Sequence, residues 1–186
     1  MGHVEIIEFA AGSPVTRFPV RSANHIEFSP DGRWLAYDEH NDIQLYDLQR
    51  HRVAATYRGH QGAIRDLHFS HDGRRLGTVS ADRTLKLWSV PAGELLYSVI
   101  AHSTDAIDLA MAPDDRRIAT VGKDRLIRLW DGQGEEPLWE YPVSTGAIGA
   151  ICFSGDGHRL LCLGYHQDLL ILDGSPAALS SDGLSP

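Results

Sequence analysis

The sequence predicts an all-β fold in which a four-stranded antiparallel sheet is repeated about four times. The first observation is the repeat itself, because an aromatic residue or a methionine precedes each of four tight-turn motifs at steps of 41 or 42 residues. The second is a period of two in the apolar residues of each repeat, which is typical of strands. The third is the Asp and Gly content of the turns, which favours tight reversals of the chain.

The repeat is visible in two columns of residues. The first column holds the residue before each turn motif, namely Phe28 before SPDG, Phe69 before SHDG, Met111 before APDD and Phe153 before SGDG. The second column closes an apolar run at steps of 42 residues and consists of Tyr46, Trp88, Trp130 and Leu172. Two columns that keep register over four copies indicate one structural unit repeated along the chain.

The second repeat shows the expected order of strands, which we call a to d. Apolar and polar residues alternate in TLKLW, and the same alternation returns in the other repeats. We expect strands over Ala63–Phe69, Arg75–Ser80, Thr84–Trp88 and Leu95–Ile100. Each repeat lacks an apolar pattern with the period of a helix.

The two ends of the chain depart from the repeat. VEIIEF and the stretch from Val15 to Val20 resemble strands c and d, whereas the fourth repeat has a, b and c but no convincing d. We therefore expect one repeat domain over residues 1–173, with a hairpin at about 4–20 and repeats at about 21–59, 60–101, 102–143 and 144–173. The Ser/Pro/Gly-rich residues 174–186 are expected to be a disordered tail.

The middle repeats resemble a known family. The second reads GHQGAIRDLHFSHDGRRLGTVSADRTLKLWS and the third AHSTDAIDLAMAPDDRRIATVGKDRLIRLWD. An opening Gly-His or Ala-His, a strand that runs into a turn with Asp, and a closing Leu-Trp are similar to the WD40 repeat. The resemblance covers roughly Val4 to Asp173. It implies β-propeller blades, each a four-stranded antiparallel sheet, arranged as an arc or an incomplete ring.

The resemblance also implies a structural hydrogen-bonded tetrad of His, Ser or Thr, Asp and Trp in each well-formed blade. Carried over, the tetrads are His60, Thr78, Asp82 and Trp88 in the second repeat, and His102, Thr120, Asp124 and Trp130 in the third. Thr78 is preferred to Ser80 because only Thr78 has a hydroxyl counterpart in the third repeat. In the first repeat the positions hold Pro19, Tyr37 and Tyr46, and in the fourth Ser144, Cys162, His166 and Leu172. The two outer blades are therefore expected to be less rigid.

Composition narrows the classes of partner. The chain has 186 residues and a formal net charge of -8, and an acidic balance argues against nucleic acid or an anionic membrane as the main partner. The first residues lack the basic segment of a signal peptide, and no apolar run is long enough to span a bilayer. With only Cys152 and Cys162, we expect reduced thiols that pack in a cytoplasmic protein.

Two sets of residues are candidates for chemistry. His60, His68 and His71 lie close in sequence, but the repeat places His60 and His71 at opposite ends of a strand, so no metal site is expected. Asp66 and Asp108 share one column of strand a, which lines the channel of a propeller, and two facing carboxylates could act as acid and base. Asn24 and Ala150 are assigned to the same column in the outer repeats.

The function predicted from the sequence is a non-catalytic scaffold that binds a protein or peptide and needs no cofactor. The expected contacts are top-face loop residues: Gln61, Arg83, Ser103, Thr104, Lys123 and Arg125. One alternative is a self-assembling half-propeller, which would form a homodimer, or a fragment of a longer propeller with blades missing upstream. The other is a hydrolase or another enzyme with a channel site at Asp66 and Asp108.

Overall fold

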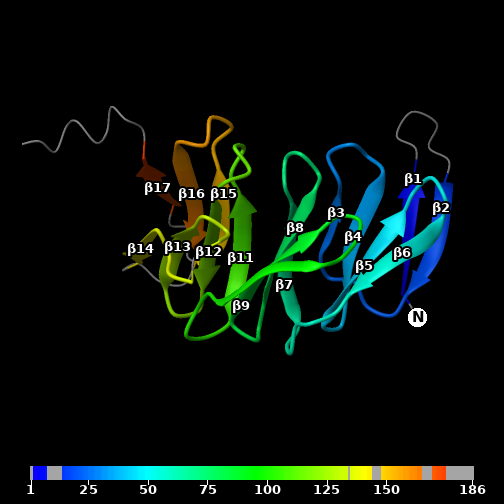
Figure 1. Cartoon of the computed structure of the whole chain (residues 1–186), viewed down its shortest axis with the longest axis horizontal. Coiled ribbons are helices and arrows are strands. Elements are labelled where there is room, and N and C mark those ends of the chain that lie inside the picture. The colour runs from blue at the N-terminus through cyan, green and yellow to red at the C-terminus, as the bar shows by residue number, and fades with distance from the viewer. Residues whose placement is uncertain (1, 8–13, 134, 144–147, 165–168, 175–186) are drawn as a thin grey trace, which may run out of the picture.

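A computed structural model describes residues 2–7, 14–133, 135–143, 148–164 and 169–174 of the chain. In the described residues, seventeen strands form five antiparallel sheets, which stand side by side in a row from the N-terminal hairpin to β17 (Figure 1). Within these residues every regular element is a strand, and none of them forms an apolar helix able to cross a membrane. The all-β fold class predicted from the sequence is confirmed.

Three sheets contain four strands in sequence order. The first sheet consists of β3 (Ile26–Phe28), β4 (Trp34–Glu39), β5 (Asp42–Asp47) and β6 (Arg52–Tyr57). The second consists of β7 (Ile64–Phe69), β8 (Arg75–Ser80), β9 (Thr84–Ser89) and β10 (Leu95–Ile100). The third consists of β11 (Ala106–Met111), β12 (Ile118–Gly122), β13 (Leu126–Trp130) and β14 (Trp139–Pro142).

The outermost two sheets are smaller. The N-terminal hairpin pairs β1 (Gly2–Ile7) with β2 (Pro14–Val20). The fourth sheet holds β15 (Ile148–Phe153), β16 (Arg159–Gly164) and β17 (Leu169–Asp173). Among the described residues this sheet therefore has strands a, b and c, where the fold prediction has four. The expected disordered tail lies outside the described residues from position 175 onward.

The turn between strands a and b explains why its motif contains Ser, Asp and Gly. In the second sheet the Ser70 hydroxyl donates to Asp72 at 2.7 Å and accepts the backbone N–H of Arg75 at 2.9 Å. Gly73 then adopts a φ of 67°, a left-handed conformation that glycine reaches without strain. In the third repeat Asp115 takes that position at a φ of 57°, and its carboxylate accepts the backbone N–H of His71 at 2.6 Å. The substitution thus ties the turn to the preceding sheet.

The hydrophobic core lies between the sheets. Each of four clusters of buried residues combines side chains of two consecutive sheets, beginning with the hairpin and the first sheet. At that first junction the rings of Phe18 and Tyr46 stack with centroids 4.0 Å apart, and at the next Tyr57 stacks on Trp88 at 5.8 Å. A sheet is therefore stabilised mainly by its neighbours, as expected for a repeat protein.

The fourth sheet leaves one apolar face exposed. Leu161 and Leu163 of β16 lie opposite Ile171 and Leu169 of β17, and all four side chains are between 38% and 60% exposed. In the second and third sheets the corresponding face packs against the sheet that follows. An exposed face of this kind indicates an interaction surface.

Candidate protein-interaction face

The four polar or aromatic residues of the second repeat meet at one end of the second sheet. His60 Nδ1 lies 2.9 Å from an Asp82 carboxylate oxygen, and His60 Nε2 lies 2.8 Å from the Thr78 hydroxyl. The Trp88 indole N–H donates to the same hydroxyl at 2.9 Å. An imidazole that carries its proton on Nδ1 satisfies all four groups, since Thr78 can then donate to Nε2. Ser80 lies outside the network and donates to the Gly62 carbonyl at 3.0 Å.

The third sheet repeats this geometry. His102 lies 2.9 Å from both Asp124 and the Thr120 hydroxyl, and the Trp130 indole donates to Thr120 at 3.0 Å. Burial lowers the pKa of His102 despite the nearby Asp124. Burial alone would raise the pKa of Asp124, but His102 and the surrounding donors hold it below its usual value. The network is buried and fully paired, which is the condition under which polar groups rigidify a core.

Each tetrad aspartate also anchors the neighbouring loops. Asp82 accepts the backbone N–H groups of Gln61 at 2.8 Å and Thr84 at 2.9 Å, and Asp124 accepts that of Ser103 at 3.0 Å. Burial opposes ionisation, yet His60 and these donors hold the pKa of Asp82 well below its usual range. The d–a and b–c loops, which lie at the end of the sheets that we call the top face, are thus fixed by the same carboxylates.

The loop residues predicted to contact a partner are all exposed on this top face. We call the set Gln61, Arg83, Ser103, Thr104, Lys123 and Arg125 the rim. Arg83 and Arg125 take left-handed φ values of 76° and 64°, at equivalent positions of their b–c turns. Lys123 contacts Asp105 at 2.8 Å, and Arg65 reaches the same carboxylate at 3.0 Å. The sheets therefore present the rim residues to solvent on anchored loops.

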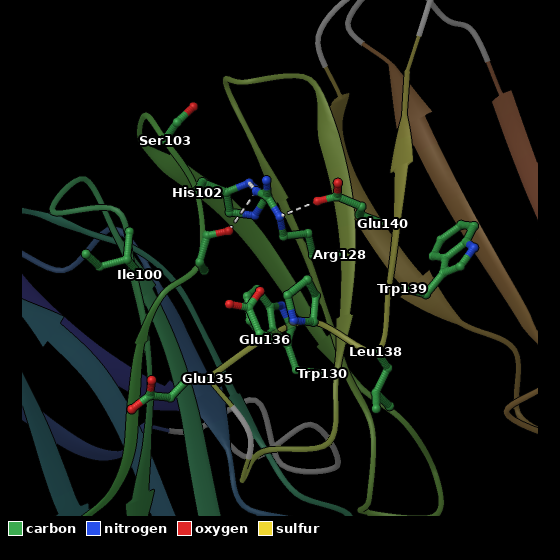
Figure 2. A pocket seen from close by; sticks show the side chains of 12 residues that line it. Ile100, His102, Ser103, Arg128, Trp130, Glu135, Glu136, Leu138, Trp139 and Glu140 are labelled. Carbon is green, nitrogen blue, oxygen red and sulfur yellow. Dashed lines mark hydrogen bonds and ion pairs between the residues drawn. The ribbon is translucent and has the colours of Figure 1, made fainter.

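A cavity of about 660 Å³ opens beside the third tetrad, between Ile100 at the end of β10 and the segment 135–140 that leads into β14. Figure 2 shows Arg128 between His102 and Glu140, with Trp130 at the base of the cavity. Arg128 donates to the Ala101 carbonyl at 2.8 Å and to Glu140 at 3.2 Å. The sequence analysis did not predict this cavity. The one signal for it is the stretch GEEPLWEYP, which stands at the place of strand d in the third repeat and, with its two prolines, departs from the pattern of strand d in the second repeat.

The two channel carboxylates do come together. Asp66 and Asp108 line a cavity of about 340 Å³ with His25 and Lys123. Burial, followed by the hydrogen-bonded Asp66 carboxyl, raises the pKa of Asp108 to about 8. His25, not Asn24, is the residue of the first repeat in this column, since it precedes Ile26 in β3 as Asp66 precedes Leu67 in β7. The assignment of Asn24 is therefore wrong by one residue, because Asp66 lies three residues before Phe69 and the residue three before Phe28 is His25.

The other candidate residues are separated by the fold. Within the described residues, no three His, Cys, Asp or Glu side chains come together in a way that could hold a metal ion. His68 pairs with Glu27 at 2.9 Å instead, and although burial opposes its charge, this contact and Asp66 raise the pKa of His68 to about 9. The expectation that both cysteines pack is wrong for Cys152, which is an exposed free thiol, whereas Cys162 is buried. Ser144 and His166, assigned to the tetrad positions of the fourth repeat, lie outside the described residues.

Comparison with protein families agrees with this geometry. The family model described as "WD domain, G-beta repeat" matches residues 52–89 and 93–131, which include the b and c strands of the second and third repeats. The chain contains WD40 repeats. These matches cover most of the second and third sheets, and the four-stranded antiparallel order of those sheets is consistent with the WD40 blades that the resemblance implies.

Curated proteins similar to this WD40 chain include WD repeat proteins from distant organisms. The Saccharomyces cerevisiae protein "Target of rapamycin complex subunit LST8" is 33% identical over 69 residues, which is 36% of this chain and 23% of that protein. "Eukaryotic translation initiation factor 3 subunit I" from Pyricularia oryzae is 33% identical over 81 residues, 42% of this chain and 23% of that protein. The alignments thus span about a quarter of these relatives' length.

Proposed function

We propose that this WD40 chain is a non-catalytic scaffold that binds a protein or peptide partner through its rim. The observation that carries the proposal is the anchoring of exposed loops by Asp82 and Asp124, whose carboxylates accept loop N–H groups from within buried tetrads. Preformed loops bind at a lower entropic cost than mobile ones. Two similar proteins are subunits by name, one of a target of rapamycin complex and one of an initiation factor. The two free thiols are compatible with the cytoplasm as its location.

Charge reversal on the rim tests the proposal. The variant Arg83→Glu/Arg125→Glu changes two exposed top-face residues, and the control Arg74→Glu/Arg116→Glu changes two exposed residues of the a–b turns at the opposite end of the sheets. Proteins captured by the tagged chain from its native extract are identified by quantitative mass spectrometry, and the affinity of the main one is then measured with purified components. We expect the top-face variant to lose that partner and the control to keep it. Equal capture by both variants would refute the rim as the binding site.

The geometry of the channel carboxylates favours packing over acid–base catalysis. Asp66 accepts the backbone N–H of Leu109 at 3.2 Å, and Asp108 accepts that of Ile151 at 2.7 Å. Both carboxylates therefore already connect one sheet to the next, which supports the non-catalytic proposal. A hydrolase activity lost in Asp66→Asn/Asp108→Asn with the fold intact would contradict it.

Self-assembly is a second candidate, and the exposed face of the fourth sheet favours it. Leu161, Leu163, Leu169 and Ile171 form two cross-strand pairs that a second copy of the chain could cover. Light scattering over a range of concentrations tests this, with Leu163→Lys/Leu169→Glu as the variant that should remain monomeric. If the wild-type chain is monomeric at all concentrations, self-assembly is contradicted. That result would instead support the alternative in which further blades cover the exposed face of the fourth sheet.

A further inference from the structure

The cavity beside the third tetrad has apolar walls and opens to solvent. Ile100 and Ala101 line it from the end of the second sheet, and Trp130, Pro137 and Leu138 line it from the third. Ile100 is 66% exposed and Leu138 is 57% exposed, so two of these apolar side chains stand at an open surface. The volume of about 660 Å³ lies within the range of about 300–1,000 Å³ that is typical of ligand pockets. The cavity is therefore large enough to take a side chain of a partner.

The preceding junction shows why Trp130 is left at the base of the cavity. Between the first and second sheets the ring of Tyr57 stacks on Trp88, which is the counterpart of Trp130. Val99 holds the register position of Tyr57 at the next junction, and a valine has no ring to lay on the indole. Trp130 lines the cavity instead, so an aromatic side chain forms part of its wall.

The carboxylates that line the cavity outnumber its cations. Glu135, Glu136 and Glu140 line it together with one arginine, Arg128. Figure 2 shows Glu140 on one side of Arg128, and Glu135 and Glu136 on the other. The guanidinium of Arg128 already donates to Glu140 at 3.2 Å and to Asp124 at 3.0 Å. In the part of the chain that the structure describes, neither Glu135 nor Glu136 forms an ion pair, so their negative charge is left unbalanced.

The remaining titratable group of the cavity does not restore the balance. Burial lowers the pKa of His102, so its imidazole is neutral at pH 7. In the second sheet the positions of Arg128 and Glu140 are held by Lys86 and Ser98, which form a hydrogen bond of 2.7 Å without a carboxylate. The acidic lining therefore belongs to the third sheet and is not a general property of the repeat.

We propose that this cavity binds the side chain of an arginine carried by a basic segment of a partner protein. The methylene groups of that arginine contact the apolar walls, and its guanidinium faces Glu135 and Glu136. Arginine combines these two properties, because its stem packs on apolar surface while its planar head donates to carboxylates in pairs. Arg83 and Arg125, whose substitution tests the rim, do not line this cavity. The site therefore goes beyond the rim proposal and can fail separately from it.

An NMR titration of the full chain with the peptide acetyl-Ala-Ala-Arg-Ala-Ala-amide tests the proposal. We expect saturable shifts of the backbone amides of Ala101, Arg128 and Leu138. The same peptide with citrulline in place of arginine keeps the shape of the side chain without its charge, and should bind at least about fivefold more weakly. Because the charges meet at an open surface, added salt should weaken binding of the arginine peptide.

Substitution of the two glutamates tests the position of the site. Glu135→Gln/Glu136→Gln changes two exposed side chains and should weaken binding of the arginine peptide at least about fivefold. The matched control Glu5→Gln/Asp42→Asn removes two carboxylates from the hairpin and the first sheet, neither of which lines the cavity. This control should bind the peptide as the wild-type chain does.

Three results would overturn the proposal. The absence of saturable shifts at the cavity amides, or equal affinity for the arginine and citrulline peptides, would show that the cavity does not take a cationic side chain. An equal loss of affinity in the two double variants would show that the peptide responds to the net charge of the chain and not to this cavity.

Discussion

The carboxylate of Asp108 accepts the backbone N–H of Ile151 at 2.7 Å, across the junction between the third and fourth sheets. The same relationship recurs one junction earlier, where Asp66 accepts the N–H of Leu109 at 3.2 Å. At the junction before that, Glu27 accepts the N–H of Phe69 at 2.6 Å. Four consecutive a strands (β3, β7, β11 and β15) are thus connected by three carboxylates, which makes the stability of the sheet row sensitive to their protonation.

Asp108→Asn should flatten the dependence of stability on pH. The pKa of Asp108 is about 8 in the folded chain and 3.8 in an unperturbed one, so between these values the folded state holds a proton that the unfolded state releases. By linkage, the free energy of unfolding falls as pH rises through that window. An asparagine mimics the protonated acid at every pH. Thermal unfolding from pH 5 to pH 8 should show a melting temperature that falls less in the variant than in the wild-type chain.

The groups around Asp108 define the controls for this measurement. Asp66, His25 and Lys123 line the same cavity. His68 also contributes to the pH dependence: because its pKa is raised to about 9, the free energy of unfolding falls as pH rises from about 6.5 toward 9. That decline should persist in Asp108→Asn. The surface variant Asp42→Asn, which removes an ion pair with Arg58, should leave the wild-type slope unchanged. Parallel curves of melting temperature against pH for Asp108→Asn and the wild-type chain would contradict the raised pKa of Asp108.

Thr78→Val should destabilise the chain more than its small change in shape suggests. Valine has nearly the shape of threonine, but the variant removes the partner of both His60 Nε2 and the Trp88 indole N–H, which are buried. Leaving a buried polar group unpaired costs about 1–3 kcal/mol. Urea unfolding followed by tryptophan fluorescence should measure a loss of that order in the free energy of unfolding.

Thr56→Val is the matched control for Thr78→Val. Thr56 donates to Gln44 at 2.7 Å on the partly exposed strand β6, where water can replace the lost partner. A surface substitution of this kind usually changes the free energy of unfolding by less than about 0.5 kcal/mol. Equal losses for the two variants would show that the tetrad makes no special contribution.

The local elements were predictable because their signals are local. β8 and β10 have the predicted bounds, and β7 and β9 differ by one residue at one end. Alternating apolar residues and Ser-x-Asp-Gly turns specify such strands within a short window. The assignment of Asn24 failed because the first step of the repeat is 41 residues and not 42, which makes His25 the counterpart of Asp66.

The contacts between sheets were less accessible from the sequence. Leu172 was identified as the departure from Trp, but whether neighbours would collapse onto it depends on Trp139 and Phe153, which belong to two different sheets. When a core residue is smaller, the loss of stability and the size of the cavity depend on how far the surrounding side chains relax. The pairing of His68 with Glu27, 41 residues away, likewise follows from the stacking of sheets rather than from either strand alone.

Gly122→Ala should destabilise the third sheet. A Cβ at Gly122 would collide with the His102 ring and lie 2.9 Å from an Asp124 carboxylate oxygen, so the tetrad would have to move. Forcing extra volume into a packed site costs about 1–3 kcal/mol. Gly155→Ala is the control, since nothing lies within 4 Å of a Cβ there. Chemical unfolding should show the larger loss for Gly122→Ala, and equal stability of both variants would contradict the observed packing.

The two cysteines should react at very different rates. Cys152 is exposed on β15, whereas Cys162 is buried on β16, and burial, followed by Cys152 and Asp108, raises the pKa of its thiol to about 12. The thiolate is the reactive form, so a soluble disulfide reagent at pH 8 should label one thiol quickly in the folded chain and both in denaturant. Cys152→Ser should remove the fast phase and Cys162→Ser should keep it. Fast labelling of two thiols, or of none, would show that these side chains are not arranged as a surface thiol and a packed one.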